Sequence, residues 1–182
     1  MTHQFSTSYL GDVTDLFQVY KRLAERAMEQ VGDNQLTLTL DSEMNSIAIV
    51  VKHMAGNMRS RWTDFLTTDG EKPDRNRDSE FVAPPSTRLD LMKLWNEGWE
   101  KVFQTLSSLS EQDLTRQVTI RGEPHSVLQA INRQLAHYAY HCGQIVFLAK
   151  HFKAEGWKSL SVPRNRSEEF TRRVLAGEIS QR

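Results

Sequence analysis

Apolar residues recur at intervals of three and four positions in four long segments of the chain, which is the spacing of an amphipathic helix. These segments span residues 4–31, 46–66, about 86–106 and about 126–152. Each carries one apolar stripe, so each helix has to pack on another helix to remove that stripe from water. The pattern predicts an all-α chain, a four-helix bundle with a long connection between its second and third helices.

Residues that cap helix N-termini stand in front of three of these segments. A Ser or Thr followed three positions later by an acid or an amide forms a capping box, which satisfies two free backbone amides. The predicted caps are Asn45 or Ser46 for the second helix, Thr87 with Asp90 for the third, and Ser126 with Gln129 for the fourth.

The connections between the helices differ in character. Residues 35–41 alternate apolar and polar positions, but an isolated short strand is not stable in water, so we expect an extended connection there. Residues 118–120 predict another extended piece, and a turn follows at residues 121–124. From about residue 154 the chain forms a tail, with a short helix expected near residues 168–175.

The connection over residues 67–85 is long and rich in charges of both signs. Structureless loops of this length are uncommon in compact domains and often have a function. This loop can cover the mouth of a site, line a dimer contact or simply be a solvated connector. Its alternating charges argue against a nucleic-acid-binding arm.

Two of the glycines and two of the tryptophans inside the predicted helices carry specific expectations. Gly98 and Gly143 each predict the close approach of a neighbouring helix or ring, because glycine lacks a Cβ atom. Trp95 and Trp99 share the apolar stripe of the third helix, and we expect both in the core rather than on a ligand platform.

Composition excludes several classes of protein. The 182 residues have a formal net charge of zero, which argues against nucleic-acid binding. No run of about 18 apolar residues predicts a membrane span, and no signal peptide is visible at the N-terminus. Cys142 is the single cysteine, so no disulfide can form within the chain. We expect one domain over residues 1–182, located in the cytoplasm.

Three histidines form the main chemical signal. His137 and His141 are four positions apart on the fourth predicted helix, so their side chains share one face and can bind one metal ion. His53 lies among apolar residues of the second helix and can supply a third ligand. The alternative is that these imidazoles are buried, hydrogen-bonded and bind nothing. His3 and His151 lie near segment ends and are not expected to be ligands.

Four polar residues share the faces that carry the histidines. Asn57 and Arg61 follow His53 by one and two turns and can approach a ligand bound at the metal; the alternative is a solvent-edge or inter-helix hydrogen bond. Gln134 and Gln144 lie on the histidine face of the fourth helix, where an amide can hold a water or a ligand imidazole. The neighbouring Cys142 is expected to point away and to be buried.

The whole pattern resembles the DinB-like superfamily, also called YfiT-like metal-dependent hydrolases, and within it a bacterial subgroup of unknown function. The most specific stretches lie in the second helix, the following loop and the fourth helix. They are residues 46–57, Ser60-Arg-Trp62, residues 65–73, Asp78-Ser-Glu-Phe81 and residues 132–141, with Trp157-Lys-Ser-Leu160 and Pro163-Arg fitting as well.

The resemblance implies an up-down-down-up four-helix bundle, and homodimers are common in the superfamily. It also implies a divalent metal on three histidines, and His53, His137 and His141 match these positions one by one. Characterised relatives include bacillithiol transferases and mycothiol-dependent isomerases. Zinc and nickel are the ions expected first, while iron and manganese also accept histidine ligands.

Three imidazoles leave at least one coordination position open, as in catalytic rather than structural zinc sites. Such a site can activate a low-molecular-weight thiol for attack on an electrophilic small molecule, or a water for hydrolysis. No Asp or Glu lies on the histidine faces of the two helices, and hydrolysis usually needs a general base. Thiol transfer is therefore preferred, with a metal-dependent hydrolase or a non-catalytic, stress-related metal-binding or interaction protein as alternatives.

Overall fold

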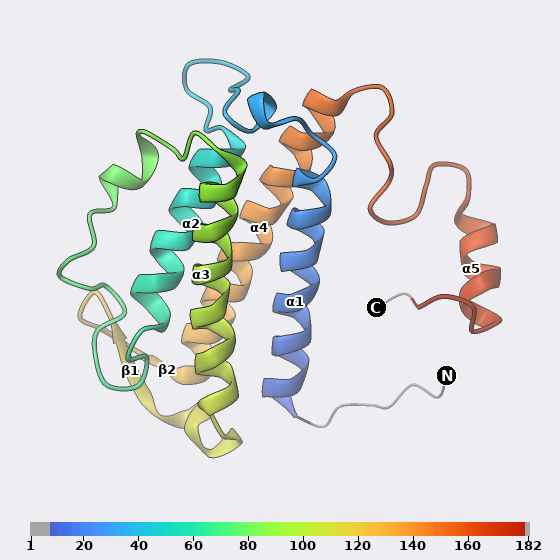
Figure 1. Cartoon of the computed structure of the whole chain (residues 1–182). Helices are drawn as coiled ribbons and strands as arrows, with labels where there is room; N and C mark the ends of the chain where they lie inside the picture. Colours follow the sequence, from blue (N-terminus) through green and yellow to red (C-terminus); the bar gives the residue numbers. More distant parts are fainter. Residues whose placement is uncertain (1–7, 181–182) are drawn as a thin grey trace.

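Each of the four long helices begins at a side-chain hydroxyl that accepts a backbone amide of its first turn. In the computed structural model, which describes residues 8–180, these helices are α1 (Tyr9–Met28), α2 (Ile47–Trp62), α3 (Arg88–Ser108) and α4 (Val127–Lys153). Their caps are Ser8, Ser46, Thr87 and Ser126. The predicted helical class and the last three caps are confirmed, and Figure 1 shows the four helices side by side.

The helix ends differ from the prediction at two places. The first helix begins at Tyr9 rather than residue 4, and the predicted residues 4–7 lie outside the described residues. The second helix ends at Trp62 rather than Leu66, because Thr63 is extended and Asp64 takes a positive φ of 49°.

The segment after α1 is not a simple extended connection. A short 3₁₀ helix, η1 (Asp33–Leu36), occupies its beginning, so the prediction for residues 35–41 is wrong there. The Gln35 side-chain oxygen accepts a hydrogen bond from the Gly32 backbone N–H at 2.8 Å. The Gln35 backbone N–H donates to the Gly32 carbonyl at 3.0 Å. These local bonds close a tight turn that the alternation of apolar residues does not reveal.

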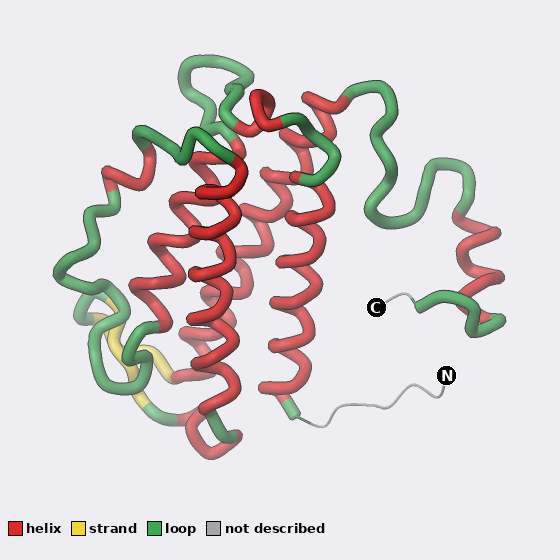
Figure 2. The backbone as a smooth tube through the Cα atoms, in the orientation of Figure 1, coloured by secondary structure: helices red, strands yellow, loops and turns green. Residues whose placement is uncertain are grey.

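A small hairpin closes the end of the molecule where α4 begins (Figure 2). It pairs β1 (Gln117–Ile120) with β2 (Glu123–Ser126) in an antiparallel register after the short η3 (Glu111–Thr115). Arg121 and Gly122 form the turn with φ of 57° and 77°, the left-handed conformation of tight hairpin turns. The extended piece and the turn were predicted, whereas the second strand was not.

Aromatic rings fill the centre of the core between the helices. Phe17 of α1 contacts Trp62, Trp99 and Tyr138, and its ring centroids lie 5.7–6.1 Å from theirs. These side chains and Trp95 are at most 2% exposed, so the core assignment of both α3 tryptophans is confirmed.

Of the two glycines predicted to mark a close contact, Gly98 and Gly143, only Gly98 does so. A Cβ atom on Gly98 would lie 3.2 Å from Ala55 Cα and 3.0 Å from Met58 Sδ, which confirms the close approach of α2 to α3. The same prediction for Gly143 is wrong, because a Cβ atom there would meet nothing within 4 Å. Gly143 lies on the exposed side of α4.

The 67–85 connection packs along α2 and contains the short 3₁₀ helix η2 (Asp78–Phe81). The Lys52 ammonium of α2 donates to the carbonyls of Ser79 and Val82, each at 2.7 Å. The predicted terminal helix is α5 (Ser167–Leu175). Among the described residues, no helix has the length and apolar character required to cross a membrane.

Candidate metal centre

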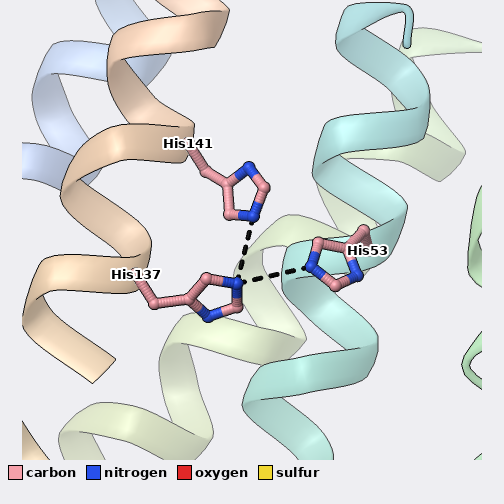
Figure 3. A group of neighbouring side chains, drawn as sticks. All are labelled: His53, His137 and His141. Carbon is pink, nitrogen blue, oxygen red and sulfur yellow. Dashed lines mark hydrogen bonds between the residues drawn. The ribbon is translucent and has the colours of Figure 1, made fainter. Parts of the chain in front are cut away.

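The three predicted histidines come together between α2 and α4. His137 Nε2 lies 3.0 Å from His141 Nε2 and 3.4 Å from His53 Nε2, as Figure 3 shows. The ligand atoms of all three side chains lie within 4.8 Å of one another. His53 and His141 are buried, and His137 is half-buried. The group can therefore hold one metal ion.

Hydrogen bonds behind two of the rings set which nitrogen is free. His53 Nδ1 donates to Glu80 Oε2 at 2.8 Å, and His141 Nδ1 donates to Gln144 Oε1 at 2.8 Å. In the neutral rings, the Nε2 atoms of both histidines are then unprotonated and face His137. A single Nε2 proton on His137 cannot satisfy both, so the cluster presents lone pairs to a common point.

The donor set and its spacing fit a first-row divalent metal. Two nitrogens bound tetrahedrally at about 2.0–2.1 Å from one ion lie roughly 3.3–3.4 Å apart. The contacts of 3.0 and 3.4 Å at His137 Nε2 are close to that value. A carboxylate or amide oxygen on the remote ring nitrogen is the usual support of a metal-binding histidine.

Burial keeps the half-buried and buried rings of α4 neutral. It lowers the pKa of His137 to about 3, and the charges of His141 and His53 lower it in the same direction. It also lowers the pKa of His141 to about 4, against the hydrogen bond with Gln144. Neutral imidazoles near pH 7 are the protonation state that binds metals.

The loop over residues 67–85 supplies polar support that was not predicted. Arg75 donates two hydrogen bonds to Glu80, from Nε to Oε1 at 2.8 Å and from Nη2 to Oε2 at 3.0 Å. Glu80 Oε2 also accepts the bond from His53. Burial alone would raise the pKa of Glu80, but the bonds from His53 and Arg75 lower it below its ordinary value. The loop therefore supports the candidate centre, and its unusual length was one signal of this in the sequence.

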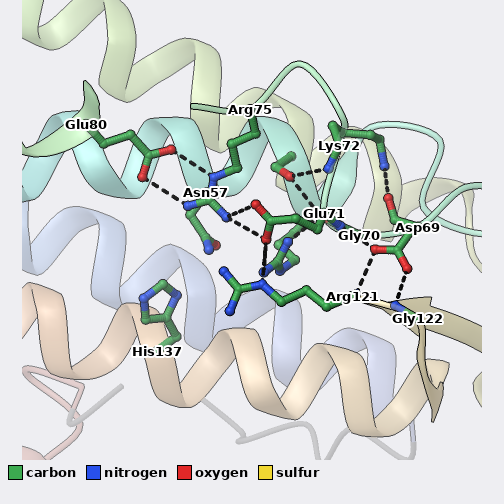
Figure 4. A network of polar contacts seen from close by, with 12 residues as sticks. Asn57, Asp69, Gly70, Glu71, Lys72, Arg75, Glu80, Arg121, Gly122 and His137 are labelled. Atoms are coloured by element: carbon green, nitrogen blue, oxygen red, sulfur yellow. Dashed lines mark hydrogen bonds and ion pairs between the residues drawn. The ribbon is translucent and has the colours of Figure 1, made fainter. Parts of the chain in front are cut away.

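A second carboxylate, Glu71, forms ion pairs with arginines from three parts of the chain (Figure 4). Its Oε2 accepts from Arg61 Nη2 of α2 at 2.9 Å and from Arg121 Nε of the hairpin at 3.1 Å. Arg75 of the same loop lies at 3.3 Å. Arg61 also donates to the Gly70 carbonyl, so it is tied to the loop rather than free to reach the histidines.

Asn57 also makes a bond that the sequence left open. Its Oδ1 accepts from the Tyr138 hydroxyl at 3.0 Å, and that hydroxyl accepts from Trp62 Nε1 at 3.0 Å. This buried chain joins α2 to α4, because Asn57 lies one turn after His53 and Tyr138 directly follows His137. Among the predicted polar neighbours, Asn57 thus makes a helix-to-helix bond, and Gln144 contacts His141, one of the candidate ligands.

Gln134 and Cys142 are both buried on α4 but differ in their contacts. Gln134 is 2% exposed, and its Oε1 has no hydrogen-bond partner in the described chain. Cys142 is fully buried outside the cluster, as predicted, and burial raises the pKa of its thiol to about 12. His151 is exposed and outside the cluster, while His3 lies outside the described residues.

A cavity of about 400 Å³ opens beside the cluster and is lined by His53 and His137. Asn57, Arg61 and Gln134 also line it, so three of the four predicted polar neighbours lie on its wall. A volume of this size accepts a small molecule.

These features define a helical protein with a possible three-histidine metal centre. The model of a family described as "Protein of unknown function (DUF1572)" matches residues 4–166 of the chain. The chain belongs to this DUF1572 family. No curated protein matches it significantly.

Proposed function

We propose that this chain is a divalent-metal-dependent enzyme that transfers a low-molecular-weight thiol to an electrophilic small molecule, on a DinB-like bundle with up-down-down-up helices. The observation that carries the proposal is the convergence of the Nε2 atoms of His53, His137 and His141, two of which, His53 and His137, also line a cavity. Zinc or nickel is the ion we expect first, with iron or manganese next.

The cluster is suited to a reactive rather than a structural ion. Among the described residues, no Cys, Asp or Glu joins the three histidines as a fourth ligand. Structural zinc sites fill all four positions with protein ligands, whereas catalytic sites keep one position for a small ligand. A divalent ion bound there would supply Lewis acidity and would lower the pKa of a thiol coordinated to it.

The protein's own residues would orient the centre and exclude competing chemistry. Glu80 and Gln144 hold the His53 and His141 rings with their Nε2 atoms toward the common point. Hydrolysis would need a free general base. Both oxygens of Glu80 are held by Arg75, and one also by His53, so this carboxylate is not free to take a proton from water.

The first test is elemental analysis of the purified, untagged protein prepared without chelator. We expect near-stoichiometric metal in the parent and its loss in His53→Ala and in His137→Ala. His151→Ala is the matched control, because His151 is an exposed histidine of the same helix outside the cluster. A parent that binds no zinc, nickel, iron or manganese after reconstitution would remove the proposal.

The second test separates thiol transfer from hydrolysis. With a chloro-dinitroarene, the thiol sulfur forms a bond to the ring carbon, chloride leaves, and the thiol proton goes to solvent. We expect metal-dependent consumption of a thiol such as cysteine, lost in His137→Ala. Metal-dependent hydrolysis of a panel of esters without thiol consumption would instead assign a hydrolase, and metal binding without either turnover would indicate a binding protein.

A further inference from the structure

The cavity beside the histidines is unusually rich in arginine for a chain whose formal net charge is zero. Arg61, Arg75, Arg77, Arg121 and Arg133 all line it, and no acidic side chain of the described residues does. We call this space the arginine cavity. The five arginines come from α2, the 67–85 loop, the hairpin turn and α4. The fold, rather than one run of sequence, therefore concentrates the positive charge.

The arginines are only partly neutralised. Glu71 and Glu80 pair with Arg61, Arg75 and Arg121 from behind the wall. Arg77 instead lies over the Phe81 ring at 4.9 Å, and no ion pair involves Arg77 or Arg133 among the described residues. Five guanidinium groups therefore face two carboxylates, which leaves an excess of positive charge in the cavity.

Two residues that line this cavity, Arg61 and Gln134, each also carry a buried polar atom without a partner among the described residues. Arg61 Nε and Gln134 Oε1 have no hydrogen-bond partner within the described chain, although both residues are at least nine-tenths buried. A buried polar atom without a partner is costly, so such atoms commonly mark where a ligand or an ordered water binds. A guanidinium N–H matches an oxyanion, and an amide oxygen matches a hydroxyl or N–H donor beside it.

The cavity is continuous with the histidine cluster. Arg133 precedes His137 by one helical turn, so the two side chains share a face of α4. His53 and His137 line the same cavity as the arginines. In Figure 4, the Arg121 side chain reaches along α4 to the side of the network nearest His137. A small molecule can therefore touch the arginines and the cluster at once.

We propose that the arginine cavity is an anion-binding subsite, which holds a carboxylate or phosphate group of the substrate while the reactive part lies at the histidines. This inference rests on the proposed function for the role of the histidines. The substrate class is accordingly a small organic anion that also carries a hydroxyl or N–H group. Either the electrophile or the thiol can carry the anionic group.

The test is calorimetric titration of the metal-free protein with inorganic phosphate and, separately, with succinate at low ionic strength. We expect binding that weakens as salt is added, because exposed charges are screened. Arg133→Gln and Arg77→Gln should each weaken it about tenfold, the size of one charge-assisted hydrogen bond. Both arginines are exposed, so these variants should fold, which circular dichroism checks.

Lys150→Gln is the matched control, because it removes one positive charge from an exposed position of α4 outside the cavity. The affinity of Lys150→Gln for phosphate and for succinate should equal that of the parent. Tighter binding of phosphate or of succinate would assign the anionic group to that chemistry. No binding of either anion, or equal binding in the arginine variants and the control, would overturn the subsite.

Repeating the titrations with metal-loaded protein separates the two proposals. Anion binding that appears only with metal and ignores Arg133→Gln would place the anion on the ion and overturn the subsite. Arginine-dependent binding in a protein that takes up no metal would support the subsite while the proposed function fails. Metal uptake without arginine-dependent anion binding would support the metal centre of the proposed function and overturn the subsite.

Discussion

Glu80 Oε2 accepts a hydrogen bond from His53 Nδ1 at 2.8 Å, and both side chains are at most 7% exposed. The contact joins the 67–85 loop to α2 across 27 positions of the chain. It fixes the ring of a candidate metal ligand, and Arg75 in turn fixes Glu80. The candidate metal centre is therefore supported by a loop that contributes none of its three histidines.

Replacing Glu80 with Gln should weaken metal binding. Glutamine keeps the shape of the side chain but removes the charge that supports His53 and pairs with Arg75. Losing such a support typically lowers metal affinity about 10- to 100-fold. Competition with a chelating dye measures the change. Glu71→Gln is the comparison, because Glu71 pairs with arginines and touches no histidine, and equal affinities in the two variants would contradict the assignment.

Gly56→Ala should reproduce the effect of Glu80→Gln without replacing any polar side chain. A Cβ atom at Gly56 would lie 2.3 Å from Glu80 Oε1, so the carboxylate has to move away from its partners. We expect lower metal affinity and lower stability, measured by dye competition and urea unfolding.

Gly143→Ala is the control for helix propensity. A Cβ atom there meets nothing within 4 Å, so alanine should raise the free energy of unfolding by up to about 1 kcal/mol. Metal affinity should not change. If Gly56→Ala behaves in the same way, Glu80 is not confined as the structure indicates.

Added metal should stabilise the protein against heat. An ion that binds only the folded state contributes about 2.7 kcal/mol at 100 times its Kd. Differential scanning fluorimetry of chelator-treated protein should therefore show a higher Tm with zinc or nickel. The increase should persist in His151→Ala and disappear in His137→Ala. An equal increase in both variants would indicate that the ion binds elsewhere.

Asp69→Asn should destabilise the protein near neutral pH. Its carboxylate accepts the amides of Glu71, Arg121 and Gly122 at 2.7–2.8 Å and so ties the loop to the hairpin turn. Burial raises the pKa of Asp69, but these backbone bonds lower it to about 2. By analogy with a helix cap, we expect a loss of about 1 kcal/mol at pH 7, measured by urea unfolding.

The pH dependence of that loss has a definite sign. A carboxyl group with a lowered pKa in the folded state stabilises the protein above its unfolded pKa. This stabilisation should shrink as the pH falls from about 4 toward 2, so the parent and Asp69→Asn should converge there. Asp74→Asn, an exposed change in the same loop, should have little effect at either pH. A constant difference down to pH 2 would refute the role of the Asp69 charge.

Sequence periodicity predicted the elements that depend on local patterns. The amphipathic stripes and the capping hydroxyls at Ser46, Thr87 and Ser126 located α2, α3 and α4, because caps and stripes act within a few residues. Gly143 was misinterpreted because a glycine in a helix indicates room for a neighbour but not which side of the helix a neighbour occupies. The up-down-down-up order and the homodimer remain predictions.

The sequence by itself determined the pairing of His137 and His141, because i, i+4 spacing places them on one face whatever the helix packs against. Only the tertiary structure decided what stands behind and beside them. Glu80, Arg75 and Arg121 reach the centre from the loop and the hairpin, and their positions follow from contacts such as Asp69 with the turn amides. Helical spacing is a property of neighbouring residues, whereas a charge network joins residues that only the folded backbone brings within hydrogen-bonding distance.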